Sequence, residues 1–303
     1  MIRPETRVQT EGEKFPPTRL LYPLPRGFRE RNVAPALPRL VEPEDLAKCA
    51  REELLLIHVA DPAAYEQAHL PGALLVTPAD LVAGTPPAVG RLPDQARLES
   101  LFSAIGYQPE RHIVVYDDEG GGWAGRFIWT LDIIGHANWS YLNGGIHAWH
   151  AAGLPLVSGN TDSVVQKPVV LQLDLSPVAE IDDVLQSIDD PDQLIWDVRS
   201  TEEFLGMRSG SRRAGHIPGA VNLDWMALKD PARHLRLVED LEGLLAAHGI
   251  DGGRAVITHC QTHHRSGLSY LVGRLLGFRR IRAYHGSWAE WGNREDTPVA
   301  SGP

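Results

Sequence analysis

Cysteine is scarce in this sequence, because only Cys49 and Cys260 occur among its 303 residues. Two cysteines cannot form a disulfide framework, and so low a content is typical of proteins from a reducing compartment. We therefore expect a cytoplasmic protein. At this length the chain holds two domains of about 150 residues each, and each is large enough to fold without disulfides or structural metal.

Long apolar runs are missing as well. No stretch of about 18 apolar residues exists, so the sequence predicts no membrane span. The N-terminus reads MIRPETRVQTEGEKFPPTRLLYPLPRGF and lacks the apolar core of a secretory signal. Its proline and its charged residues predict an irregular arm over residues 1–36.

An excess of positive charge is also absent. The 29 Lys and Arg stand against 39 Asp and Glu, which gives a net charge of −10. This balance argues against nucleic acid and anionic membranes as partners, although a local cluster of positive groups still suits a small anion. There is no Walker loop and no GxGxxG after a strand, so we expect no organic cofactor.

What the sequence does contain is an internal repeat. Residues 54–76, LLLIHVADPAAYEQAHLPGALLV, match residues 194–223, LIWDVRSTEEFLGMRSGSRRAGHIPGAVNL. Each copy has an apolar strand, a polar turn, a short helical piece and then His-x-Pro-Gly-Ala. A repeat of this length is best interpreted before any single motif, because it sets the architecture.

The match continues further along each copy. HIVVYD at 112–117 parallels AVITHC at 255–260, and each is followed by a helical segment that ends on glycine and by a strand, a glycine turn and a tryptophan. Alternating strands and helices predict a mainly parallel sheet with helices on both faces. We therefore expect an α/β protein with two tandem domains, at 37–157 and 180–303, joined by a polar linker at 158–179.

The strongest chemical signal is HCQTHHRSG in the second copy. An apolar strand runs into Cys260, the loop closes on Arg265, and Ser266 is the predicted N-cap of the next helix. A loop that turns into a helix N-terminus points backbone N–H groups inward and forms an anion cradle. The helix dipole and the Arg265 guanidinium favour the thiolate, so Cys260 is the candidate nucleophile.

The first copy lacks this chemistry. Asp117 stands at the position that corresponds to Cys260. A carboxylate cannot act as a sulfur nucleophile, and it would repel an anionic donor. We expect the first copy to be catalytically silent and to cover one side of the catalytic loop.

Several motifs in this order resemble the rhodanese superfamily in its tandem two-domain form. They are the two HxPGA signatures, DVRSTEEFLG at 197–206, the Cys-x4-Arg-Ser loop, and the closing motifs NGGIHAW and HGSWAEW. The loop CQTHHRSG is similar to that of two-domain bacterial thiosulfate sulfurtransferases. The resemblance covers nearly the whole chain outside the N-terminal arm and implies two tandem rhodanese-like domains.

The resemblance implies a double displacement. A thiolate takes the outer sulfur of thiosulfate as a persulfide on Cys260, and cyanide or a thiol then accepts that sulfur. The acceptor thiol can belong to a thioredoxin-like or other sulfur-acceptor protein. Arg265 is implied to orient the cradle and bind the anionic donor, and Arg199 is implied to lie near the mouth of the site.

Further residues complete the predicted substrate site. His263 and His264 are expected to line its mouth and add partial positive charge. Trp225 follows the second HxPGA strand, where a pocket wall is expected. The predicted substrate-binding residues are Gln261, Thr262, His263, His264, Ser266, Arg199 and Trp225.

Three alternative functions remain open. Mercaptopyruvate-specific relatives typically carry a CGSGVT-like loop, and many have arginine where this sequence has Glu203, so 3-mercaptopyruvate is the weaker donor. The spacing HC-x4-R resembles the HC-x5-R loop of cysteine phosphatases, but the shorter loop makes a smaller cradle than phosphate needs. A noncatalytic sulfur-carrier or binding protein is the third, but rhodanese modules that only bind or regulate partners usually lack the cysteine that the second copy keeps.

A metal site is a further alternative, because His259, Cys260, His263 and His264 cluster like zinc ligands. Backbone N–H groups that point into a cradle disfavour a cation, so we expect no metal there.

Other prominent side chains have structural interpretations. His69 and His216, in the two HxPGA signatures, are expected to cap a turn before the next strand. Trp149, Trp288 and Trp291 are expected in the core or between the domains.

Overall fold

The structure is a computed structural model, and it describes residues 37–49, 54–160 and 165–302. The predicted arm at 1–36 lies outside the described residues. Within the described part, no helix is both long and apolar enough to cross a membrane.

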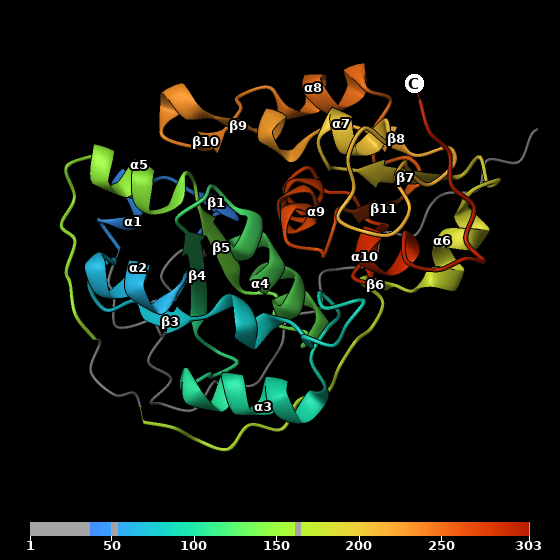
Figure 1. Cartoon of the computed structure of the whole chain (residues 1–303). Coiled ribbons are helices and arrows are strands. Elements are labelled where there is room, and N and C mark those ends of the chain that lie inside the picture. The colour runs from blue at the N-terminus through green and yellow to red at the C-terminus, as the bar shows by residue number, and fades with distance from the viewer. Residues whose placement is uncertain (1–36, 50–53, 161–164, 303) are drawn as a thin grey trace, which may run out of the picture. The chain divides into compact units, whose positions relative to one another are not determined.

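The first half of the described chain forms a five-stranded parallel sheet with the strand order β1-β5-β4-β2-β3 (Figure 1). Its strands are β1 (Leu40–Val41), β2 (Leu54–Val59), β3 (Leu74–Val76), β4 (His112–Asp117) and β5 (Trp139–Leu142). Its helices are α1 (Pro43–Leu46), α2 (Pro62–Gln67), η2 (Pro78–Leu81), α3 (Gln95–Ala104), α4 (Gly122–Ile133) and α5 (Gly145–Ala151).

The second half repeats this sheet with the order β6-β12-β11-β7-β8. Its strands are β6 (Val178–Ala179), β7 (Gln193–Asp197), β8 (Val221–Asn222), β11 (Ala255–His259) and β12 (Ile281–Tyr284). Its helices are α6 (Ile181–Ser187), α7 (Thr201–Phe204), η3 (Trp225–Leu228), η4 (Pro231–Arg233), α8 (Leu241–Ala247), α9 (Arg265–Leu275) and α10 (Ser287–Trp291). A short antiparallel pair, β9 (Lys229–Asp230) and β10 (Arg236–Leu237), lies between η3 and α8.

Helices cover both faces of each sheet, because alternate side chains of a strand point to opposite faces. In the first sheet Ile57 packs in one buried cluster with Phe127 of α4, whereas Leu56 packs in another with Trp149 of α5. In the second sheet Val256 and Ile257 divide in the same way between the cluster of α9 and that of α10. The α/β repeat that the sequence predicts is therefore confirmed.

Two glycines bring the halves together along α4 and α9, which lie next to each other in Figure 1. A β-carbon at Gly125 would lie 2.2 Å from the carbonyl oxygen of Gly267, and one at Gly267 would lie 2.3 Å from that of Gly122. Backbone therefore touches backbone near the start of both helices, which places the loop before α4 against the loop before α9. Both helices end as predicted, since Gly135 and Gly277 follow them with φ values of 74° and 76°.

The polar segment between the sheets lies against the first half. Residues 165–177 have no regular secondary structure. The Leu171 N–H donates to the Glu99 carboxylate at 3.1 Å, and the Asp174 N–H donates to the Ile133 carbonyl at 2.7 Å.

The three tryptophans lie in the core as predicted, whereas His69 and His216 bond the helices that precede them rather than a turn before the next strand. Trp149, Trp288 and Trp291 have no exposed surface. His69 stacks on Tyr65, and His216 stacks on Phe204. Each histidine also hydrogen bonds through Nδ1 to the backbone carbonyl of its stacking partner, at 2.8 Å in both cases.

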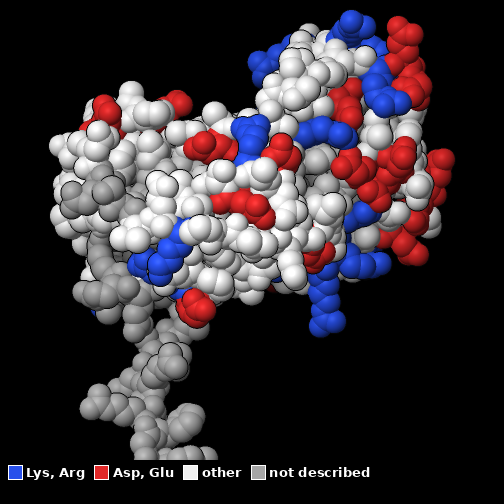
Figure 2. All heavy atoms as spheres, turned by 90° about the horizontal axis from the view of Figure 1, so that it is seen from below, with Lys and Arg blue, Asp and Glu red and all other residues white. Residues whose placement is uncertain are grey.

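Charged side chains of both signs are interspersed on the surface. On the face seen in Figure 2, Lys and Arg lie among Asp and Glu rather than as a separate basic area. An anion that approaches this face would therefore meet mixed charge rather than a broad positive field.

Candidate active site

Cys260 lies at the carboxyl end of β11, where the strand passes into the loop before α9. Its side chain is buried, with 1% of its surface exposed. The sheet positions the thiol, because β11 lies between β7 and β12 and its last residue, His259, pairs in register with Asp197.

The start of α10 holds the Cys260 loop from the other side. The backbone N–H groups of Trp288 and Ala289 donate to the carbonyls of Cys260 and Gln261, both at 2.9 Å. Ser287 makes this approach with φ at 53°, and its hydroxyl accepts from the Cys260 N–H at 3.4 Å. The closing motif HGSWAEW thus clamps the nucleophile loop, a role that the sequence did not reveal.

The surroundings of Cys260 favour its thiolate. Burial by itself raises the pKa of the thiol, but the Arg265 charge, the Ser266 hydroxyl and backbone N–H, and His264 together hold the pKa below its ordinary value. The Ser266 hydroxyl lies 3.5 Å from the sulfur. A thiol of low pKa in a cradle of hydrogen-bond donors is suited to nucleophilic attack on an anionic sulfur compound.

Ser266 does not cap the helix, so that prediction is wrong. The N-cap is His264, α9 begins at Arg265, and Ser266 lies inside the first turn. Its hydroxyl bonds His263 Nδ1 at 2.8 Å and faces Cys260. Contact with the sulfur, rather than helix capping, is what places a serine there.

Arg265 reaches the site but already has a partner. Its two terminal nitrogens donate to the two carboxylate oxygens of Glu203, at 2.6 and 2.9 Å. Glu203 belongs to α7, where its carboxylate also completes a capping box with Ser200. Glu203 therefore lies at the site as the partner of Arg265, whereas the sequence marks it only as a position where many mercaptopyruvate-specific relatives have arginine. The capping-box spacing STEE carried a signal for the helix start, but none for the ion pair.

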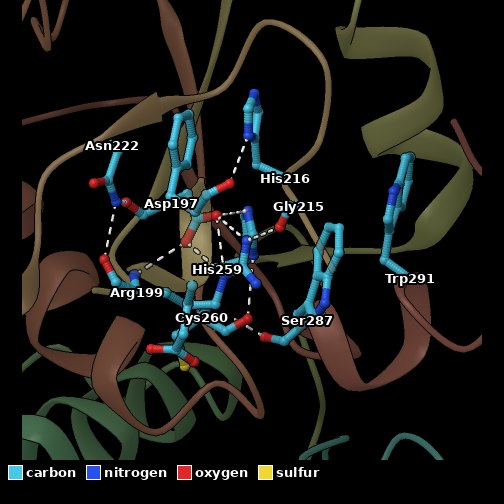
Figure 3. Close-up of polar contacts among 12 residues, drawn as sticks. Asp197, Arg199, Gly215, His216, Asn222, His259, Cys260, Ser287 and Trp291 are labelled. Atoms are coloured by element: carbon cyan, nitrogen blue, oxygen red, sulfur yellow. Dashed lines mark hydrogen bonds and ion pairs between the residues drawn. The ribbon is translucent and has the colours of Figure 1, made fainter. Parts of the chain in front are cut away.

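Arg199 is not near the mouth of the site, and that prediction is wrong. It has no exposed surface, and its guanidinium donates to Asp197 and to the Gly215 carbonyl and lies over Trp288 (Figure 3). A buried guanidinium needs such partners, because an unpaired charge is costly away from water.

The same buried network supports the residue before the nucleophile. His259 Nε2 lies 3.6 Å from Asp197, and Nδ1 lies 3.2 Å from the Cys260 carbonyl (Figure 3). Burial lowers the pKa of His259, despite the opposing effect of Asp197. These groups lie behind the Cys260 loop and fix its backbone.

His263 does not line the mouth either, and that prediction is also wrong. Its φ of 54° is left-handed, and the side chain is buried with its ring edge against Trp129, at 4.6 Å between centroids. Burial, followed by the charge of Arg126, holds the pKa of His263 well below its usual range. The ring therefore stays neutral and adds no positive charge.

His264 and Trp225 do come together. The His264 side chain is 24% exposed, stacks on Trp123 at 4.4 Å and meets Trp225 edge-on at 5.6 Å. These three rings form an aromatic cluster, which draws on both halves of the chain. Its composition could not be foreseen, because Trp123 belongs to the silent copy.

The other two predicted loop residues lie at the edges of the cradle. The Gln261 amide donates to the Ser211 hydroxyl at 3.1 Å. Ser211 lies in GMRSGSRR, residues 206–213, a segment of the second copy that the first copy lacks. Thr262 packs under the first half, since a β-carbon at Gly90 would lie 1.9 Å from the Thr262 carbonyl oxygen.

The corresponding loop of the first half is also a cradle, and its own carboxylate fills it. Asp117 accepts the backbone N–H groups of Gly120, Gly121 and Ala124 at 3.0, 2.8 and 2.9 Å, and more distantly that of Glu119 at 3.3 Å. Burial, and then the nearby Glu119, raise the pKa of Asp117 to about 6, against the opposing effect of these N–H groups. The carboxylate takes the place that an anion would occupy.

A zinc site at the loop has no support in this geometry. Among residues 37–49, 54–160 and 165–302, no three His, Cys, Asp or Glu side chains are grouped to hold a metal ion. His263 points inward, whereas His264 points to Glu119, so the clustered ligands of the sequence diverge in space.

The family profile of the rhodanese-like domain matches the chain twice, at residues 42–152 and 180–294. The chain is 48% identical over 265 residues to the thiosulfate sulfurtransferase of Azotobacter vinelandii, a match that covers 87% of this chain and 97% of that protein. It is 47% identical over 264 residues to the thiosulfate sulfurtransferase of Pseudomonas aeruginosa, with coverage of 87% and 97%.

Solved structures share the fold at lower identity. YnjE is similar with a TM-score of 0.78 and 21% identity, over 88% of this chain and 68% of that one. The anaerobic ergothioneine biosynthesis enzyme of Chlorobium limicola is similar with a TM-score of 0.76 and 20% identity, over 88% and 70%. At these identities the similarity concerns the fold alone.

Proposed function

The chain belongs to the rhodanese family, and from that membership we propose that it is a thiosulfate sulfurtransferase that carries sulfane sulfur as a persulfide on Cys260. The observation that carries the proposal is that the buried Cys260, with the Ser266 hydroxyl 3.5 Å from its sulfur, stands where the first half has a carboxylate held by backbone N–H groups. The two bacterial relatives that match over nearly their whole length are thiosulfate sulfurtransferases.

The reaction has two displacement steps. The Cys260 thiolate attacks the outer sulfur of thiosulfate, the sulfur–sulfur bond of thiosulfate breaks, and its electron pair leaves on sulfite. An acceptor thiolate or cyanide then attacks the outer sulfur of the persulfide and returns Cys260 as thiolate. The N–H groups of the cradle and the Arg265 charge stabilise the anions in both steps.

The halves have different tasks in this proposal. Residues 180–303 form the catalytic domain, residues 37–157 form a silent domain because Asp117 replaces the nucleophile, and residues 158–179 link them. Cys260 and Arg265 act in catalysis. Residues 261, 262, 264 and 266, together with Trp225, surround the donor.

The remaining expectations belong to the same proposal. The protein works in the cytoplasm with a small anionic donor and a thiol or cyanide acceptor, which includes thioredoxin-like or other sulfur-acceptor proteins. It needs no cofactor and acts on neither nucleic acid nor membrane.

Intact mass measured before and after thiosulfate tests the proposal. We expect a gain of about 32 Da, one sulfur atom, that cyanide removes. Cys260→Ser should never show the gain. Cys49→Ser, which removes the other free cysteine, should show it in full.

Two outcomes would contradict this assignment. A gain that persists in Cys260→Ser would place the sulfur elsewhere. A gain only with 3-mercaptopyruvate would change the donor while keeping the chemistry.

A further inference from the structure

Glu119 belongs to the silent half, yet it contacts the catalytic half at two points. Its carboxylate oxygen Oε1 bonds His264 Nε2 in the Cys260 loop. Its backbone carbonyl accepts from Lys229 Nζ at 2.5 Å. Lys229 is 5% exposed and lies at the end of the segment that carries Trp225.

These two contacts involve both second-half rings of the aromatic cluster, those of His264 and Trp225. His264 is held directly, through its imidazole. Trp225 is held through Lys229, whose ammonium lies 3.4 Å from the centre of the indole ring. A cation this close to an aromatic face is attracted to it. Residue 119 therefore contacts both second-half segments that carry these rings, the His264 segment through its carboxylate and the Trp225 segment through its backbone carbonyl.

The loop around Glu119 is built to present it. Asp117 gathers the backbone N–H groups of the loop, and Glu119 Oε1 also accepts from the Trp123 N–H at 3.1 Å. Gly122 leaves the necessary room, because a β-carbon there would lie 2.4 Å from Glu119 Oε1 and 2.8 Å from His264 Nε2. The pair thus depends on a glycine that faces both side chains.

We propose that Glu119 is a positioning residue for the sulfurtransferase site, contributed by the half of the chain that has no nucleophile. It holds the partly exposed imidazole of His264 in one orientation beside the Cys260 loop. If this side chain is ordered before the donor binds, binding does not have to include the loss of its conformational entropy. The inference rests on the proposed function, because it concerns donor binding at the same site.

Steady-state kinetics of the full chain test the inference with thiosulfate as the donor. Glu119→Gln keeps the shape and the backbone carbonyl but removes the negative charge that meets His264. We expect KM for thiosulfate to rise about threefold to tenfold with kcat nearly unchanged, the size of effect expected for a partly buried ion pair.

A matched control separates positioning from simple attachment of the two halves. Glu42 is another first-half carboxylate that pairs with a second-half cation, Arg236, at 2.9 Å. Glu42→Gln should leave KM for thiosulfate unchanged. If Glu119→Gln lowered the unfolding temperature but left KM at the wild-type value, its role would be structural only and the inference would be overturned.

A double-mutant cycle identifies the partner. If Glu119 acts through His264, Glu119→Gln should add little to KM in a His264→Asn background. An undiminished effect in that background would also overturn the inference. Failure of the proposed function looks different, because then the wild-type protein itself would gain no sulfur from thiosulfate.

Discussion

At the scale of single residues, one position in the repeat has two chemistries. Asp117 is the last residue of a central strand and Cys260 directly follows one, and each lies before the first turn of a helix. The Asp117 carboxylate accepts the N–H groups of its own loop, whereas in the proposed function the Cys260 thiolate accepts a transferred sulfur. The difference lies in the side chain, since the two strands have the same place in their sheets.

Arg265 should control how readily Cys260 ionises. The pKa of the thiol is lowered against the effect of burial, and Arg265 is the foremost group that lowers it. Arg265→Ala should therefore raise the pKa of Cys260. The thiolate fraction at neutral pH would fall, and the curve of ionisation against pH would move to higher pH.

The rate of alkylation by iodoacetamide between pH 5 and 10 measures this ionisation, in a Cys49→Ser background so that one thiol reacts. Arg274 is the matched control, because it lies on the same helix and pairs with Asp132 at 3.2 Å. Arg274→Ala should leave the curve in place. An unmoved curve in Arg265→Ala would remove the role given to that arginine.

At the scale of elements, the contact between α4 and α9 determines how the silent loop meets the catalytic loop. The two helices touch through backbone at Gly125 and Gly267. Side chains of ordinary size would separate the helices and move Glu119 and Trp123 away from His264. The small residues at this crossing therefore help to position the side chains around Cys260, although they take no part in the chemistry.

Gly125→Ala should lower both stability and activity. The new methyl group would meet the Gly267 carbonyl oxygen at 2.2 Å, and a backbone atom cannot yield as a side chain can. We expect a loss of about 1–3 kcal/mol in the free energy of unfolding, as for overpacked cores. Urea denaturation and thiosulfate turnover measure the two effects.

Gly273→Ala is the control for the helix propensity of alanine. It lies in α9, and its β-carbon would crowd the end of the Ile281 side chain, at 2.4 Å, while Phe278 lies at the ordinary contact distance of 3.4 Å. The Ile281 side chain can rotate, so stability and turnover should change little. Equal losses in the two variants would show that the close helix crossing is not the cause.

At the scale of the whole molecule, one buried arginine joins the halves at the nucleophile loop. Arg126 has no exposed surface and donates to the carbonyls of Leu81 and Gly90 at 2.7 Å and to that of His263 at 3.4 Å. Burial lowers the pKa of Arg126 to about 9, against the opposing effect of Cys260. Three segments that are distant in sequence thus share one guanidinium.

Arg126→Gln should destabilise the protein by about 2–4 kcal/mol, because buried carbonyls would lose their donor. Arg97→Gln is the matched control, since Arg97 also donates to two carbonyls but is exposed. We expect it to cost less than about 1 kcal/mol. Urea denaturation measures both, and similar losses would contradict the view that burial makes Arg126 important.

The sequence by itself determined the repeat and the two parallel sheets, and it predicted Cys260 as the nucleophile and the first copy as catalytically silent. These follow from neighbours along the chain, because strand and helix periods and the Cys-x4-Arg spacing are local properties. Ser266 shows where even local reasoning failed, since the contact between its hydroxyl and Cys260 is tertiary.

Only the tertiary structure decided which charges meet. Arg265 pairs with Glu203, Arg199 turns into the core with Asp197, and His264 meets Glu119 of the other half. The left-handed backbone at His263 turned a predicted mouth residue inward. The partners of Arg265 and His264 lie 62 and 145 residues away, and they are chosen by packing and by the cost of leaving a buried charge unpaired, which depend on the complete fold.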